Sequence, residues 1–95
     1  MKRELLVSDY AQADLGQVIA WYEERRPGLG DRFLLAVLGS ITRFSHGWPV
    51  IGRGIRRALV SGFPYRVYYR AYDSAILAVG VFHLKRNPRE WKKRA

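Results

Sequence analysis

The stretch from residue 55 to 88, IRRALVSGFPYRVYYRAYDSAILAVGVFHLKRNP, constrains the fold of this chain more than any other. Residues 55–60, 65–72 and 75–82 are rich in aromatic and β-branched side chains, which favour strands. The short connections between them carry Gly, Pro and Asp, which favour tight turns. Parallel strands need a crossover of roughly a dozen residues or more, so connections this short predict antiparallel hairpins.

The run 65–72 separates its side chains into two faces, because successive strand residues point in opposite directions. The first face is predicted to be directed at the core, and it holds Tyr65, Val67, Tyr69 and Ala71. The second face alternates cations with rings, and it holds Arg66, Tyr68, Arg70 and Tyr72. Two interpretations stay open for the second face: a surface for a phosphate backbone or an acidic peptide, or a solvated face where Arg stems cover Tyr rings.

The N-terminal half predicts a short strand at residues 2–7 and a hairpin of two helices. Ser8 or Asp9 is a typical N-cap for a helix over residues 9–26. A second helix is expected from residue 30 or 31 to about 46, and the short break at 27–30 makes the two helices antiparallel. The apolar side chains of the second helix cover a wide arc: Phe33, Leu34, Val37, Leu38, Ile41 and Phe44. Residues 45–54 hold four Gly or Pro, so we expect no regular structure there.

The last strand, 75–82, is nearly all apolar, which indicates a central strand covered on both faces. After it, Asn87 is expected to cap a short terminal helix with Pro88 at its first position and Trp91 as its anchor on the sheet. Trp48 either plugs the edge of the core or is exposed. The fold class is therefore α+β in one domain over residues 1–95: a short strand, a helix hairpin and an antiparallel sheet, in the order β-α-α-β-β-β.

Net charge is +9, and its position is more informative than its size. Residues 1–50 hold six Lys or Arg and six Asp or Glu, whereas residues 51–95 hold eleven and two. The predicted partner of the second half is therefore anionic, either nucleic acid or an acidic protein segment. The chain has no cysteine and two histidines, so we expect a cytoplasmic protein with no disulfide, no metal site and no cofactor. No apolar run approaches the roughly 20 residues of a membrane helix.

Six stretches, in this order and spacing, resemble the RelE/ParE superfamily of toxins from type II toxin–antitoxin systems. They are Ser8 to Leu15, Gly30 to Phe33, Pro49 to Gly52, Arg56 to Val60, Phe63 to Tyr69 and Val79 to Pro88. The resemblance covers nearly the whole chain. It implies a small toxin that is neutralised in a hetero-oligomer by a cognate antitoxin, typically through an acidic and partly disordered segment.

The superfamily has two activities: RelE-like members cut messenger RNA on the ribosome, and ParE-like members inhibit DNA gyrase. The sequences FPYRVYY and VFHLKRNP resemble the ParE-like branch and the related plasmid-stabilisation proteins. The resemblance therefore implies growth arrest through gyrase. Two alternatives stay open, a ribosome-dependent endoribonuclease and a non-toxic basic nucleic-acid-binding module.

Metal-free RNA cleavage needs a base, an acid and cations at the phosphate. Resemblance to RelE-like members implies that Arg66 and His83 would be the catalytic residues. The sequence departs from that pattern because no Tyr follows Tyr72, and His83 has a structural alternative as a hydrogen-bonded residue that holds the terminal segment. The candidate residues for binding antitoxin or nucleic acid are Arg56, Arg57, Arg66, Tyr68, Arg70, Lys85, Arg86 and Arg89.

Overall fold

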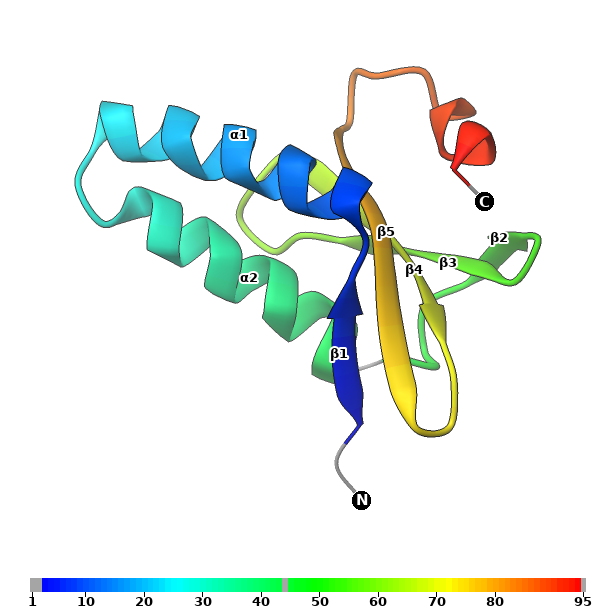
Figure 1. Cartoon of the computed structure of the whole chain (residues 1–95). Helices are drawn as coiled ribbons and strands as arrows, with labels where there is room; N and C mark the ends of the chain where they lie inside the picture. Colours follow the sequence, from blue (N-terminus) through cyan, green and yellow to red (C-terminus); the bar gives the residue numbers. More distant parts are fainter. Residues whose placement is uncertain (1–2, 44, 95) are drawn as a thin grey trace.

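The computed structural model describes residues 3–43 and 45–94. These residues form two helices, five strands and a short terminal turn, arranged as in Figure 1. The elements are β1 (Glu4–Val7), α1 (Asp9–Arg25), α2 (Leu29–Arg43), β2 (Val50–Gly52), β3 (Ile55–Leu59), β4 (Tyr65–Ala71), β5 (Ala75–His83) and the 3₁₀ turn η1 (Glu90–Lys93). The α+β class, the helix hairpin and the three antiparallel strands are as the sequence predicts.

The strands form one sheet in the order β1-β5-β4-β3-β2. β5, β4, β3 and β2 pair antiparallel, whereas β1 pairs parallel to β5, from Glu4 opposite Ala75 to Val7 opposite Ala78. The sheet is therefore mixed. The sequence predicts a strand near the N-terminus but holds no local signal for its partner, because that partner lies at the far end of the chain.

The structure of residues 45–54 differs from the prediction that this segment has no regular structure. Val50–Gly52 forms the short strand β2, which pairs with β3, where no regular structure was predicted. Arg53 and Gly54 both have positive φ, 52° and 74°, which is the backbone of the two-residue type I′ turn that suits a hairpin. The same Gly residues that indicate a loop therefore build a hairpin turn. Helix α2 ends at Arg43, before the expected end near 46, and Phe44 lies outside the described residues.

Both helices begin at recognisable capping groups. Ser8 caps α1, as predicted, and its Oγ accepts the backbone N–H of Ala11 at 3.1 Å. The carboxylate of Glu23, on α1, accepts the N–H groups of Gly28 and Gly30 at 2.9 and 3.0 Å. A Cβ on Gly30 would lie 2.8 Å from the carbonyl oxygen of Ile19, so the close approach of the two helices requires glycine there.

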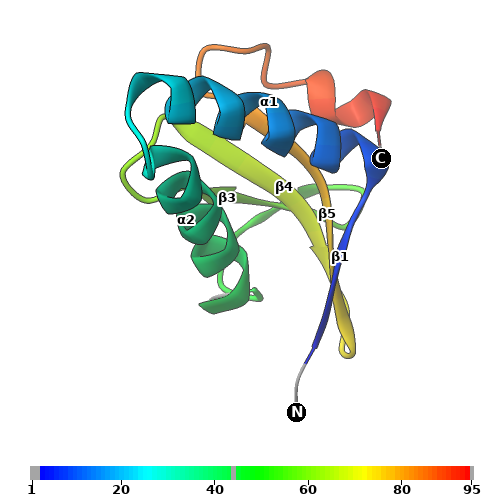
Figure 2. The same ribbon diagram turned by 60° about the vertical axis from the view of Figure 1, so that its left-hand side comes forward.

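The helices cover one face of the sheet, which we call the inner face (Figure 2). Phe33, Val37 and Ile41 of α2 are buried there against Val67 and Tyr69 of β4, with the predicted Tyr65 and Ala71 packed at the margin. Trp48 is half-buried against this core, and its Nε1 donates to the carbonyl of Ser40 at 2.8 Å. The predicted core-directed face of β4 is thus confirmed, and Trp48 plugs the edge of the core.

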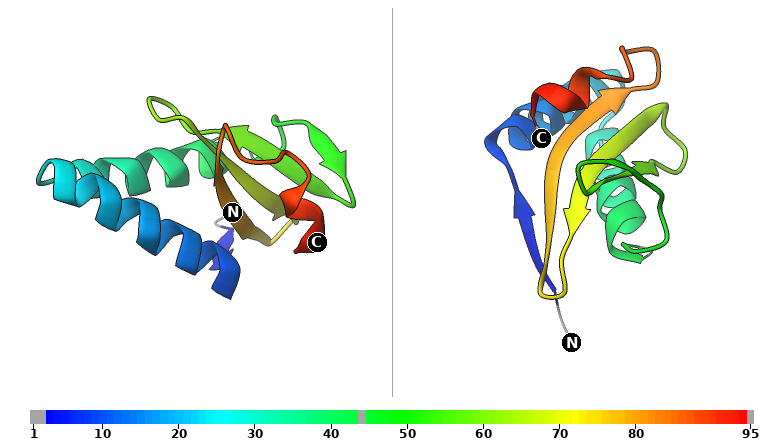
Figure 3. Two further views of the ribbon diagram at one scale, coloured as in Figure 1. Left: turned by 90° about the horizontal axis from the view of Figure 1, so that it is seen from above. Right: turned by 90° about the vertical axis from the view of Figure 1, so that its right-hand side faces the viewer.

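The opposite face, called here the outer face, is covered by the segment that follows β5 (Figure 3). Trp91 of η1 is 5% exposed and packs with a second cluster of buried side chains. That cluster contains Ile55, Tyr68, Val79 and Phe82. The prediction that Trp91 anchors a short helix on the sheet is confirmed, as is the prediction that β5 is covered on both faces. The helix is a 3₁₀ turn, and it begins at Glu90 instead of Pro88.

Candidate functional site

Arg57 and Arg66 are the predicted site residues that share the outer face. Arg57 lies opposite Tyr68 in the β3–β4 register, and Arg66 lies opposite Leu59 on one side and Phe82 on the other. Opposite residues of an antiparallel pair point to the same face, so both guanidiniums stand beside the outer cluster. Within residues 3–43 and 45–94 the ion pairs involve Arg25, Arg86 and Arg94, and neither Arg57 nor Arg66 takes part in one.

His83 does not share that face. It lies opposite Tyr65, which packs on the inner core, whereas Arg66 lies opposite Phe82 of the outer cluster. The rings of His83 and Tyr65 meet edge to face with centroids 5.0 Å apart, and His83 Nδ1 accepts the backbone N–H of Lys85 at 3.0 Å. Because neighbouring strand residues alternate between faces, Arg66 and His83 point to opposite sides of the sheet. The structure therefore does not bring the two candidate catalytic residues together.

Three candidate binding residues are engaged inside the fold. Arg56 Nη1 donates to the carbonyls of His46 and Trp48 at 3.1 and 2.5 Å, and Arg70 donates to the carbonyl of Arg53. Each of these bonds is made by Nη1, so both guanidiniums keep further N–H donors. Tyr68 is 2% exposed, and the ring of Trp91 stacks over it at 6.5 Å between centroids. The expectation that Tyr68 offers a stacking ring on an open face is wrong, because the terminal segment covers it.

The remaining candidates, Lys85, Arg86 and Arg89, are exposed on the segment between β5 and η1. Arg86 pairs with Glu90 at 2.5 Å and lies 4.8 Å from the centre of the Phe82 ring. The predicted cap at Asn87 takes the form of a local turn, in which Asn87 Oδ1 accepts the N–H of Arg89 at 2.9 Å. These basic side chains thus extend the positive charge of the outer face along the terminal segment.

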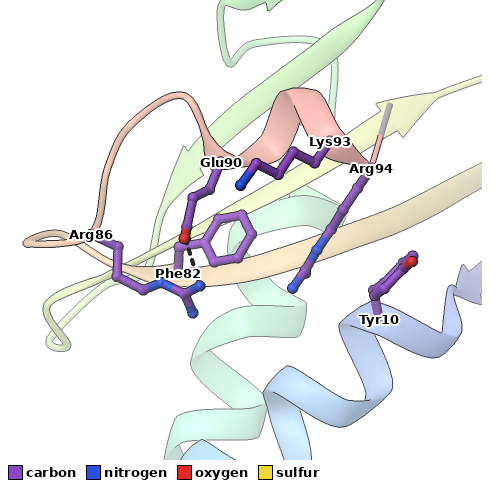
Figure 4. A pocket seen from close by; sticks show the side chains of 6 residues that line it. All are labelled: Tyr10, Phe82, Arg86, Glu90, Lys93 and Arg94. Carbon is purple, nitrogen blue, oxygen red and sulfur yellow. Dashed lines mark ion pairs between the residues drawn. The ribbon is translucent and has the colours of Figure 1, made fainter.

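A pocket of about 270 Å³ opens where this segment approaches α1 (Figure 4). Its lining is made by Tyr10, Phe82, Arg86, Glu90, Lys93 and Arg94. The Arg94 guanidinium lies 4.8 Å from the centre of the Tyr10 ring and 4.5 Å from that of Phe82. Arg86 pairs with Glu90 and Arg94 pairs with Asp14, whereas Lys93 takes part in none of the ion pairs of the described residues. Two of the three cations that line the pocket are therefore matched by carboxylates.

Asp14 of α1 supplies the carboxylate that holds Arg94. Its Oδ2 lies 2.5 Å from Arg94 Nη1 and also accepts the backbone N–H of Val81 at 2.9 Å. The register of β4 and β5 shifts between Tyr68 and Tyr69, and a Cβ on Gly80 would lie 2.8 Å from Arg94 Nη1. A β-bulge with a glycine therefore makes room for Arg94 to cross the sheet edge and reach α1.

Comparison with known proteins supplies a structural relative. No protein-family model and no curated protein matches the sequence. A solved chain from the chromosomal ParDE TA system of P. aeruginosa matches with a TM-score of 0.66, at 16% sequence identity, over 85% of this chain and 95% of that chain. The two chains therefore share a fold.

The sequence analysis did not predict the ion pair between Asp14 and Arg94. Asp14 follows Ala11 by three positions and precedes Val18 by four, so it lies on the face of α1 that packs inward. A single carboxylate on an apolar helix face indicates a partner inside the fold, because a buried carboxylate needs a cation or an N–H donor. The sequence gives no indication that the cation comes from Arg94, which is distant along the chain.

Among the described residues there is no group of three or more His, Asp or Glu side chains that could hold a metal ion. The described helices are too short or too polar for any of them to cross a bilayer.

Proposed function

We propose that this chain is the toxin of a type II toxin–antitoxin pair and that it arrests growth by inhibiting DNA gyrase, as the ParE-like branch does. The observation that carries this choice is the separation of Arg66 and His83 on opposite faces of the sheet. General acid–base catalysis needs both groups within hydrogen-bond reach of one substrate. The ParE/RelE-like fold supports membership of such a pair, and the face assignment supports its non-nucleolytic branch.

A cognate antitoxin with an acidic segment is the proposed partner. Arg57 and Arg66 of the outer face are half-buried, and Lys85 and Arg89 of the terminal segment are exposed. Residues 51–95 contain two carboxylates against eleven basic side chains. A disordered segment that folds on binding must offset the cost of ordering, and charge pairing together with apolar burial supplies that free energy. This composition favours a hetero-oligomer with an acidic protein.

The decisive experiment compares gyrase with messenger RNA as the target. The purified chain is added to a gyrase supercoiling assay, and transcript 5′ ends are mapped across the genome minutes after the chain is induced in a growing bacterium. We expect inhibited supercoiling and no new ends in coding regions. His83→Ala and Arg66→Ala are compared with His46→Ala and Arg26→Ala, which remove the same groups from exposed positions outside the candidate site.

Two other results would each favour one of the alternative functions. New 5′ ends inside coding regions that disappear with Arg66→Ala or His83→Ala, and persist in the two controls, would mean that the chain is a ribosome-dependent endoribonuclease. Normal growth together with nucleic-acid binding that weakens steeply with salt would mean a non-toxic basic binding module, since the slope reports the number of phosphates contacted.

A further inference from the structure

β1 forms one edge of the sheet, and one side of its backbone has no neighbouring strand. Among the described residues β1 pairs with β5 alone (Figure 3). Glu4 and Ser8 donate their N–H groups to carbonyls on the β5 side at 2.9 and 3.0 Å. Because the backbone groups of a strand alternate in direction, those of Leu5 and Val7 point away from β5. We call this side of β1 the free edge.

One hydrogen bond at the free edge shows the same direction. The carbonyl of Val7 accepts the side-chain amide of Gln12, in the first turn of α1, at 3.1 Å. A carbonyl oxygen has two lone pairs, so it can accept a further N–H as well. The free edge therefore offers the N–H and C=O groups of both Leu5 and Val7 to another strand.

Apolar side chains are exposed on both faces of the sheet at the free edge. Leu5 is 36% exposed on the inner side, and Leu6 is 41% exposed on the outer side. A cavity of about 400 Å³ opens beside Leu5, and it is lined by Arg3, Leu5, Thr42, Ser45 and Ile76. β1 contains neither Pro nor Lys, which natural edge strands use to prevent pairing. It is therefore suited to pair with a further strand.

The sequence of β1 favours pairing with itself. The apolar residues Leu5, Leu6 and Val7 lie between the polar Glu4 and Ser8. Antiparallel pairing about a two-fold axis at Leu6 sets Leu5 of each copy opposite Val7 of the other, and the two Leu6 side chains opposite one another. Each Leu5–Val7 pair exchanges two main-chain hydrogen bonds, because both residues direct these groups to the free edge. An axis at Leu5 would instead set Leu6 opposite Glu4, so the apolar pattern favours the axis at Leu6.

The distribution of charge favours a second copy as the occupant. Residues 1–50 carry six basic and six acidic side chains, and the excess of cations lies in residues 51–95. β1 lies at the edge of the sheet opposite to β2 and β3. With neighbouring strands about 4.8 Å apart, the β3 strands of two copies joined at β1 would lie on the order of 30 Å apart, beyond the Debye length of about 8 Å. An acidic partner would find its complementary charge at the other edge.

We propose that two copies of this chain associate through β1, antiparallel about a two-fold axis at Leu6, so that their sheets join into one. Both helix hairpins then cover the same side of the joined sheet. The proposal concerns self-association and does not depend on the action on gyrase. Stable interfaces bury roughly 1,200–2,000 Å² in total, and a four-residue strand provides less, so the dimer is weak, with a Kd of about 10–100 μM.

Sedimentation velocity of the full chain, at concentrations from about 1 to 500 μM, tests this association. We expect the wild type to change from monomer to dimer over this range. Leu6→Glu should remain monomeric, because two like charges would lie directly opposite one another at the axis. Leu59→Glu is the matched control, since Leu59 is 48% exposed on β3, away from β1, and it should dimerise as the wild type does. Circular dichroism checks that both variants are folded.

Two outcomes of sedimentation would overturn the proposal. A wild type that stays monomeric at every concentration would show that the free edge does not pair with a second copy. Dimerisation that Leu59→Glu abolishes and Leu6→Glu leaves intact would place the contact at the other edge of the sheet.

A cysteine variant tests the position of the axis without adding a charge. The natural chain has no cysteine. At the predicted axis the two copies of residue 6 form a non-hydrogen-bonded pair with Cα atoms about 4.5 Å apart, which a disulfide can span. Leu6→Cys should therefore form a covalent dimer with oxidised glutathione, whereas Leu59→Cys should not. Absence of the Leu6→Cys dimer, or equal cross-linking of both variants, would overturn the assignment to β1.

Hydrogen exchange distinguishes strand pairing from other contacts at the same place. At concentrations where the wild type is dimeric, the amides of Leu5 and Val7 should exchange more slowly than in the monomer. The amide of Leu6 should exchange equally in both states, because it already faces β5. Unchanged exchange at Leu5 and Val7 in the dimer would overturn the pairing. Inhibition of gyrase is measured separately, so either proposal can fail alone.

Discussion

At the scale of single residues, the described chain uses a few polar side chains to join elements that are distant in sequence. Asp14 links α1 to the β5 bulge and to Arg94, and both side chains of the pair are at most 16% exposed. Tyr69 is fully buried and donates its hydroxyl to the carbonyl of Ser45 at 2.7 Å. Removing one partner of such a contact leaves the other without compensation in a poorly hydrated place.

Asp14→Asn should therefore lower the free energy of unfolding by roughly 2–4 kcal/mol. The amide keeps the shape of the carboxylate, so the loss reports the charge that balances Arg94. Urea unfolding at neutral pH measures it, with Asp73→Asn in the exposed β4–β5 turn as the control. A change no larger than that of Asp73→Asn would show that Arg94 gains nothing from the pairing.

The buried Tyr69 should make the free energy of unfolding depend on pH in the alkaline range. Burial raises the pKa of Tyr69 above its ordinary value of 10.0, although nearby Arg56 and Arg3 oppose the rise. Above pH 10 the unfolded state therefore loses this proton before the folded state does, and the free energy of unfolding falls as the pH rises toward the raised pKa of the folded state.

Tyr69→Phe should cost about 1 kcal/mol at neutral pH, through the lost hydrogen bond, and should make the decline above pH 10 shallower. Denaturant unfolding from pH 8 to 11 tests this. Tyr72→Phe, at an exposed position, should leave the shape of the profile as in the wild type. Parallel profiles for wild type and Tyr69→Phe would contradict the assignment.

At the scale of elements, the sheet is enclosed by two unequal covers. The helix hairpin covers the inner face, and a single short segment ending in η1 covers the outer face (Figure 3). Trp91 is the main side chain of that smaller cover, and a Cβ on Gly52 would lie 3.2 Å from its ring. The close approach of β2 and η1 therefore depends on glycine at position 52.

Trp91→Ala should lower the free energy of unfolding by about 3–5 kcal/mol, as removal of a buried aromatic side chain does. It should also bare Tyr68 and Phe82, which an increase in binding of a hydrophobic dye would reveal. Trp21→Ala is the control, because Trp21 is 50% exposed on α1. Similar losses for both variants would mean that the terminal segment does not hold the outer cluster.

At the scale of the whole molecule, the positive net charge destabilises the folded state. The excess of cations lies in the sheet and the terminal segment, where like charges repel in the folded chain. Salt screens exposed charges, with a Debye length of about 10 Å at 0.1 M, and affects the buried Asp14–Arg94 pair much less. The midpoint of thermal unfolding should therefore rise when sodium chloride increases from about 0.02 to 0.2 M.

Calorimetry at constant pH measures this midpoint. A variant with Lys92 and Lys93 both changed to Gln should start from a higher midpoint at low salt and respond less to added salt. A midpoint that falls with salt would mean that exposed attractions outweigh the repulsion.

Local patterns predict most of the fold and less of the site. Period-two alternation identifies the inner face of β4, and Ser8 marks the start of α1. The sequence does not reveal that Trp91 buries Tyr68, that Asp14 meets Arg94, or that Arg66 and His83 face apart, because each depends on register or on contacts between distant segments. The strand β2 escapes prediction because its three residues, one of them a glycine, lie between Pro49 and Arg53 and carry too weak a pattern.

The parallel pairing of β1 with β5 has a consequence for synthesis on the ribosome. Glu4 pairs with Ala75, so the first strand leaves the exit tunnel long before its partner has been translated. At about 5–20 residues per second, this nascent strand waits roughly 3–15 s. During that time Leu5 and Leu6 are exposed on a strand with no neighbour, which is a risk for aggregation. The helix hairpin likewise has no sheet to cover until β4 and β5 emerge, and the outer face stays uncovered until Trp91 of η1 follows them.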